Sequence, residues 1–162
     1  HYTTPAKVKT QLQYLTKTGS GSNTSTTAQN TTIYNSSNVP SGAKRVTITG
    51  GLNAQSDQYY CYLNVNGSNF VASTLTNENI TITTGTTQIQ TRFGNSGRVD
   101  YGSFKIDIDL NTGSYVINVS ANTRYNGAGI IIGRGTISSV VASLRGNGSS
   151  ASSTNYTITY TY

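Results

Sequence analysis

Strict alternation of apolar and polar side chains is the feature of this sequence that most constrains its fold. The alternation is clearest in SFKIDIDLNTGSYVINVS, residues Ser103–Ser120, where apolar side chains occupy every second position on both sides of Asn111-Thr112-Gly113. Because successive side chains of a β-strand point to opposite faces, this pattern predicts two strands that each bury one face. The short glycine-containing loop between them predicts a β-hairpin.

The same alternation recurs in short runs from Thr31 to the closing NYTITYTY, residues Asn155–Tyr162, with turn signals between the runs. Apolar residues nowhere recur at the spacing of an amphipathic helix. About half of the residues are Gly, Ser, Thr or Asn, and 17 of them are glycines. We therefore predict an all-β fold for residues 31–162, an antiparallel β-sandwich of the jelly-roll type.

The segment QYYCYLNVNGSNF, residues Gln58–Phe70, is predicted to hold a strand whose inward face carries Cys61, Leu63 and Val65. Its Asn66-Gly67 pair predicts a hairpin turn, because a type I′ turn needs positive φ at both central residues. Cys61 is the only cysteine, so it is expected to be a small buried apolar residue that forms no disulfide within the chain.

The first thirty residues differ from the rest. Ala6–Thr16 alternates, with Val8, Leu12 and Tyr14 on one side, and predicts a strand with an apolar stripe. Lys17–Asn30 is polar, contains glycine and lacks periodicity, so it is predicted to be a linker or long loop. We expect residues 1–30 to form an extension, separate from the domain at 31–162, whose strand pairs with a neighbour or folds back on its own sandwich.

Few side chains suit catalysis. The single histidine is His1, and a terminal residue is a poor base for a nucleophile. Asp107 and Asp109 share a predicted strand face with Lys105, which indicates a solvated outer face rather than a pair of catalytic carboxylates. We expect a protein that is not an enzyme and needs no cofactor or metal. A carbohydrate-active enzyme is the weakest of the alternatives considered.

The net charge of +6 comes from scattered basic residues without a run of three, so nucleic acid is not the expected partner. No apolar run approaches the roughly 18 residues of a membrane span. Tyr60 and Tyr62 point away from the face of Cys61 on the predicted strand. They are candidates for contact with a ligand such as a sugar ring, or else for packing in a second layer or against a neighbouring subunit.

Three stretches carry a family resemblance: VPSGAKRVTITGG (Val39–Gly51), GSFKIDIDLNTGSYVINVSA (Gly102–Ala121), and GTISSVVASLRGNG (Gly135–Gly148) with the closing NYTITYTY. In the positions of their turns and strands they resemble the C-terminal β-domain of tailed-bacteriophage virion proteins, tail-fibre-like proteins in particular. The resemblance spans roughly residues 31–162. The chain departs from the pattern in having no Trp and in ending on Tyr162 where an acidic residue is usual.

The resemblance implies a structural or adhesive component of a virion, such as a tail-fibre, appendage or capsid-decoration domain. Its expected partners are further copies of itself, as a trimer or filament, and other virion proteins or a host cell-surface glycan. The alternative is a secreted subunit of a cellular surface filament or adhesin, joined by donation of the Ala6–Thr16 strand to the next subunit. In that case His1 would mark cleavage of a signal peptide.

Overall fold

The computed structural model describes the backbone of residues 14–55, 61–66, 70–74, 80–82, 88–93, 99–122 and 127–162, and side chains within 14–53, 63–65, 102–120 and 130–162. These residues form strands in two antiparallel sheets, and the helical structure among them is one 3₁₀ turn, η1 (Ser36–Asn38). No helix in the described ranges has the length and apolar character needed to cross a membrane.

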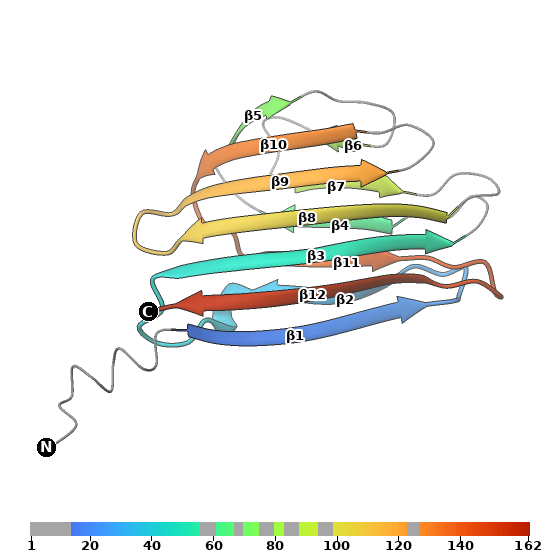
Figure 1. Cartoon of the computed structure of the whole chain (residues 1–162), viewed down its shortest axis with the longest axis horizontal. Coiled ribbons are helices and arrows are strands. Elements are labelled where there is room, and N and C mark those ends of the chain that lie inside the picture. The colour runs from blue at the N-terminus through green and yellow to red at the C-terminus, as the bar shows by residue number, and fades with distance from the viewer. Residues whose placement is uncertain are drawn as a thin grey trace, which may run out of the picture.

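The two sheets lie face to face, with the seven-stranded sheet in front in Figure 1. In spatial order, the seven-stranded sheet consists of β1 (Tyr14–Asn23), β12 (Ser152–Thr161), β3 (Arg45–Gln55), β8 (Val99–Asp109), β9 (Ser114–Asn122), β10 (Gly127–Arg134) and β5 (Phe70–Thr74). The five-stranded sheet consists of β2 (Gln29–Asn35), β11 (Ser139–Leu144), β4 (Cys61–Asn66), β7 (Gln88–Phe93) and β6 (Ile80–Ile82). The prediction of an all-β antiparallel sandwich is confirmed.

The connectivity is that of a jelly roll. β1 pairs with β12, β2 with β11, β3 with β8, and β4 with β7, so early and late strands are nested as in a rolled-up hairpin. The four-strand blocks β1-β12-β3-β8 and β2-β11-β4-β7 lie in different sheets, which is the double-sheet arrangement of jelly rolls. β9, β10 and β5 widen the first block, and β6 widens the second.

One apolar core fills the space between the sheets. Both inner faces supply it, and each well-buried Val, Leu or Ile side chain contributes about 1.5–3 kcal/mol relative to exposure. The seven-stranded sheet contributes Val46, Ile48, Leu52, Phe104, Ile106, Ile108, Tyr115, Ile117, Val119, Ile131, Ile158 and Tyr160, and the remainder of the chain contributes Ile33, Tyr34, Leu63, Val65, Ile137, Val140, Ala142 and Leu144.

The predicted hairpin is present as β8 and β9, which pair from Tyr101–Asn122 to Ile108–Tyr115 around a turn that contains Gly113 at φ 74°. Leu63 and Val65 are buried as expected. Cys61 lies in β4, but its side chain is outside the described residues.

The linker prediction for Lys17–Asn30 is wrong. β1 runs to Asn23 and pairs over its whole length with β12, and β2 already begins at Gln29. β1 shows no apolar alternation because it is the edge strand of its sheet and most of its side chains are exposed on both faces. Residues 14–30 are therefore part of the sandwich. Of the predicted strand Ala6–Thr16, only Tyr14, Leu15 and Thr16 lie within the described residues.

The hairpin predicted at Asn66-Gly67 is also wrong. β4 ends at Asn66 and pairs with β11 and β7, whereas β5 begins at Phe70 and pairs with β10 in the other sheet. The chain thus changes sheets at a position where its local sequence favours a tight turn, because the pairing partners of β4 come from distant parts of the chain.

Candidate functional site

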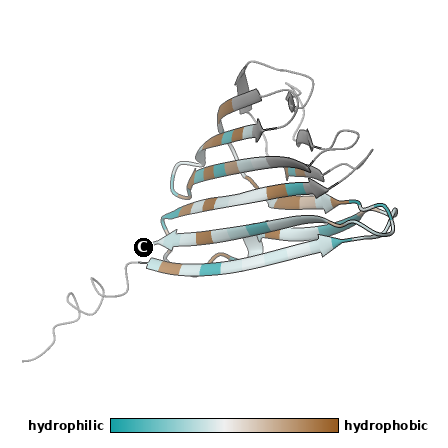
Figure 2. Cartoon of the chain, turned by 45° about the vertical axis from the view of Figure 1, so that its right-hand side comes forward, coloured by the Kyte–Doolittle hydropathy of each residue, from teal (hydrophilic) through white to brown (hydrophobic). Residues whose placement is uncertain are grey.

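The outer face of the seven-stranded sheet carries aligned rows of small polar side chains. Antiparallel pairing places residues directly opposite one another on the same face, so neighbouring strands build rows across the sheet. Two threonine rows cross β1, β12 and β3: Thr16, Thr159 and Thr47, and then Thr18, Thr157 and Thr49. The near-neutral hydropathy of these strands appears as long pale stretches on β1 and β12 in Figure 2.

The threonine rows end at a charged pair on β8. Thr47 Oγ1 donates a hydrogen bond of 2.9 Å to Asp107 Oδ1, and Lys105 Nζ lies 3.9 Å from Asp107 Oδ2. The expectation that Asp107 and Lys105 share the outer face is confirmed. An ion pair exposed to this degree contributes little to stability, since the median for such pairs is about 0–1 kcal/mol.

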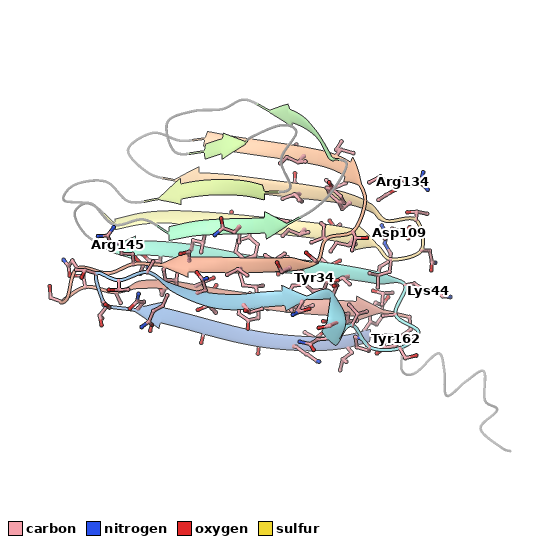
Figure 3. All side chains as sticks on the ribbon, turned by 180° about the vertical axis from the view of Figure 1, so that it is seen from behind. Tyr34, Lys44, Asp109, Arg134, Arg145 and Tyr162 are labelled. Carbon is pink, nitrogen blue, oxygen red and sulfur yellow. The ribbon has the colours of Figure 1, made fainter. Side chains whose placement is uncertain are left out.

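Asp109 has a structural role at the β8–β9 turn. Its Oδ1 accepts hydrogen bonds from the backbone N–H of Asn111 at 2.9 Å and of Thr112 at 3.1 Å. The hydrogen bond from Thr112 has the largest effect on the pKa of the Asp109 carboxyl. Together with the bond from Asn111 and the positive charge of Arg45, it holds this pKa below its usual value. The general acid of a glycosidase needs a raised pKa. The pKa of Asp109 is shifted in the opposite direction. Figure 3 shows Asp109 at the same end of the sandwich as Lys44 and Arg134.

A small-residue row runs beside the threonine rows, across five strands. It consists of Ser20 on β1, Asn155 on β12, Gly51 on β3, Ser103 on β8 and Ser120 on β9. Around its first half lies a hollow of about 610 Å³, lined by Ser20, Gly21, Ser22, Gly51, Leu52, Asn53, Gly102, Ser153, Thr154 and Asn155. None of these lining residues is charged.

A second hollow of about 290 Å³ lies around the other half of the small-residue row. It is lined by Ser103, Phe104, Lys105, Asn118, Val119, Ser120 and Ile130. The hydroxyl groups of Ser103 and Ser120 lie 2.6 Å apart and form a hydrogen bond. The two hollows are neighbours, because Gly102 lines the first and the adjacent Ser103 lines the second.

Among the side chains that the structure describes, large apolar ones are exposed at two places. Ile130 and Ile132 project from β10 with exposed fractions of 45% and 58%. Tyr14, Leu15 and Tyr162 are exposed at the opposite edge of the sheet, where the start of β1 meets the end of β12. The described residues hold no cluster of three or more His, Cys, Asp or Glu side chains suited to a metal ion.

The site residues predicted from sequence are mostly outside the described part of the chain. Val8, Leu12 and Tyr60 lie outside it, and for Tyr62 only the backbone position in β4 is described. Tyr14 is the first residue of β1 and its side chain is 64% exposed. Sequence reasoning missed the small-residue row. Its available signal was a glycine inside a strand, Gly51, which often marks a close approach of another molecule or of backbone.

Comparison with known proteins adds no relative: no protein-family model matches the sequence, and no curated protein matches it. The site is therefore interpreted from its own chemistry.

Proposed function

We propose that this chain is a non-enzymatic structural and adhesive domain of a virion, part of a tail fibre, an appendage or a capsid decoration. In this role it binds a host surface or a neighbouring virion protein. The fold is compatible with this function, since double-sheet jelly rolls occur in viral capsid proteins and in lectin domains. That support is an analogy of fold, because one fold serves many functions.

The observation that carries the proposal is the outer face of the seven-stranded sheet, with its small polar side chains and two neighbouring hollows. A broad face of hydroxyl and amide groups offers many hydrogen-bond donors and acceptors, as an adhesive surface requires. Of the stretches that resemble virion proteins, Gly135–Gly148 contains β11 of the five-stranded sheet, and the others contribute to the seven-stranded sheet. Val39–Gly51 contains the first half of β3, Gly102–Ala121 contains most of β8 and β9, and the closing stretch lies in β12.

We further propose that the domain works as a homo-oligomer. β1 is a ten-residue edge strand, and a long exposed edge invites pairing with another chain. The exposed side chains of Tyr14, Leu15 and Tyr162 gather beside the start of that strand. The same edge favours the second candidate function, a secreted filament or adhesin subunit that receives a strand from its neighbour.

Fractionation of the culture that produces the chain separates the two candidates. Virus particles purified on a density gradient, and cell-surface filaments sheared from the same cells, are each digested and analysed by mass spectrometry. The proposal predicts peptides of this chain in the particle fraction. Peptides found only in the filament fraction would favour the second candidate, and their absence from both fractions would reject both.

A further inference from the structure

We infer that the free edge of β1 receives residues Ala6–Gln13 of a second copy, which add a strand to the seven-stranded sheet. The inference rests on the homo-oligomer of the proposed function and names the two surfaces that join its subunits. Residues Ala6–Gln13, here called the arm, lie outside the described residues and lead directly into Tyr14, the first residue of β1. The acceptor edge belongs to the described part of the chain and forms the margin of the front sheet (Figure 1).

The edge of β1 is long and regular. All ten residues of this strand pair with β12 without a shift of register. Among the described residues, the backbone hydrogen bonds made outside the strand ladders involve none of residues 14–22. In an antiparallel edge strand, every second residue directs its N–H and C=O groups away from the neighbouring strand. β1 therefore presents a row of backbone groups to which a further strand can add.

The usual protections of an edge strand are missing from β1, which contains no proline and no bulge. Its one charged residue is Lys17, whose Nζ lies 5.7 Å from the centroid of the Tyr160 ring on β12, so the ammonium group is directed away from the free edge. β2, an edge strand of the other sheet, has only seven residues, and its register with β11 shifts between Val140 and Val141. Because short strands and bulges protect edges, β1 is the better acceptor.

The core side of β1 is incompletely covered near its start. Leu15 stands opposite the buried Tyr160, so its side chain is on the core side of the sheet, yet it is 38% exposed. Tyr162, which follows β12 at the same end of the sheet, is 37% exposed. A strand with apolar side chains, added beside β1, would remove part of this surface from water.

The arm has the sequence pattern of such a strand. Its even positions carry Ala6, Val8, Thr10 and Leu12, and its odd positions carry lysine or glutamine. If the even positions lie on the core side of β1, the arm covers Leu15 while its lysines and glutamines face water. Eight residues at about 3.3 Å each span roughly 26 Å, which fits along the ten-residue edge.

The arm is not built to turn back onto the β1 of its own chain. Tyr14 already pairs with Thr161, so a reversal would have to occur within the arm itself. Tight hairpin turns favour Gly, Asn, Asp or Pro, and Ala6–Gln13 contains none of these. A turn at Pro5 would bring the chain back along the arm rather than along β1. The arm therefore reaches a second copy, and because donor and acceptor are different surfaces, the contact builds an open chain or a ring.

The test of the donor uses the full chain with paired substitutions in the arm. Val8→Asp with Leu12→Asp places charges on the side assigned to the core. Gln11→Asp with Gln13→Asp is the matched control, because it makes the same change in net charge on the side assigned to water.

The test of the acceptor uses single substitutions at the start of β1. Leu15→Asp alters the core side of the edge, and Thr16→Asp is its control, since Thr16 is exposed on the outer face. Circular dichroism checks that each variant is folded. Leu15→Ser replaces Leu15→Asp if the aspartate variant is unfolded.

Light scattering measures the assembly of each variant alone and in mixtures. We expect both controls to assemble as wild type does. The arm variant and the Leu15 variant should each associate at least about tenfold more weakly, since apolar side chains lose their burial. Mixed in equal amounts, these two variants should form a heterodimer that grows no further, because one supplies an intact edge and the other an intact arm.

Three outcomes would overturn the inference alone: an arm variant that assembles as wild type does, an equal loss of assembly in the Gln11→Asp/Gln13→Asp control, or a mixture that stays monomeric. Each of them leaves the homo-oligomer and the virion location standing. An intact chain that is a monomer would reject the homo-oligomer together with the inference. Absence of the chain from virus particles would reject the virion function whatever the assembly tests show, so the failures are distinguishable.

Discussion

The ring of Phe104 lies over Gly50, in the space that a side chain at Gly50 would occupy. The two residues stand directly opposite each other on β8 and β3, and a Cβ at Gly50 would also come within 2.5 Å of the carbonyl oxygen of Asn155. Gly51, the next residue of β3, points to the outer face of the sheet and lines the first hollow there. Adjacent glycines thus serve different purposes, one for packing and one for the surface.

This difference predicts unequal effects of alanine. Gly50→Ala should lower the free energy of unfolding by about 1–3 kcal/mol, because the Phe104 ring and the β12 backbone must shift. Gly51→Ala is its control and should stay within about 0.5 kcal/mol of wild type, as surface substitutions usually do. Denaturant unfolding measures both. Equal losses in the two variants would contradict the packing described here.

Asn23 fixes the end of β1, in the segment that sequence reasoning took for a linker. Its side chain is only 5% exposed, and its Nδ2 donates to the carbonyl oxygens of Thr27 at 2.8 Å and Leu144 at 2.7 Å. Its Oδ1 accepts from the N–H of Ser25 at 2.9 Å. Asn23→Ala should cost about 1–3 kcal/mol because buried backbone groups lose their partners. The exposed Thr26→Ala is the control, and no loss in Asn23→Ala would mean that this segment is not anchored.

Two buried tyrosines predict loss of stability at high pH. Burial raises the pKa of Tyr34 to about 12, with a smaller contribution from Tyr160, and burial alone raises the pKa of Tyr115 to about 12. Since the unfolded value is about 10, the folded chain keeps protons that the unfolded chain loses. This part of the stability is complete below about pH 10 and is lost as the pH rises toward about 12.

Unfolding curves recorded from neutral pH to pH 12, with tyrosinate absorbance, measure this effect. The Tyr34→Phe variant should show a shallower decline above pH 10, since it lacks one of the buried phenol groups whose pKa is raised. A stability that is flat across this range, or a buried phenol that titrates near 10 in the folded chain, would show that the tyrosines are not shielded as described.

Assembly can be tested without damaging the sandwich. Removing residues 1–13 leaves β1 whole, whereas a deletion through Ser20 would also remove most of a strand that pairs with β12. Light scattering should give an oligomer for the intact chain and an assembly of fewer subunits for residues 14–162. An intact chain that is a monomer at micromolar concentration would refute the homo-oligomer. If the number of subunits is unchanged after the deletion, only the role given to the N-terminal residues is refuted, and the homo-oligomer stands.

The elements that could be predicted from the sequence are strands with one face on the core and the other face in water. β8 and β9 alternate because Phe104, Ile106 and Ile117 face a core while their neighbours face water. β1 could not be recognised in this way, because its edge position leaves its threonines and serines exposed. The change of sheet after Asn66 depends on pairing with distant strands, which a local turn signal does not report.

The small-residue row could not be predicted for a related reason. Ser20, Gly51 and Asn155 are far apart in the chain and become neighbours only through the register of β1, β12 and β3. Apart from Gly51, a glycine inside a strand, these residues give no signal in their own segments. Their common property, small or polar groups in one row, exists only after the sheet has formed.

Immunogold electron microscopy of purified virus particles, with antibody raised against the folded chain, examines the proposed location at the particle surface. We expect gold on the tail or on the capsid exterior of intact particles, because an adhesive domain must be accessible from outside. Gold confined to filaments on the cell surface, or to the cell interior with unlabelled particles, would contradict a virion function for this chain.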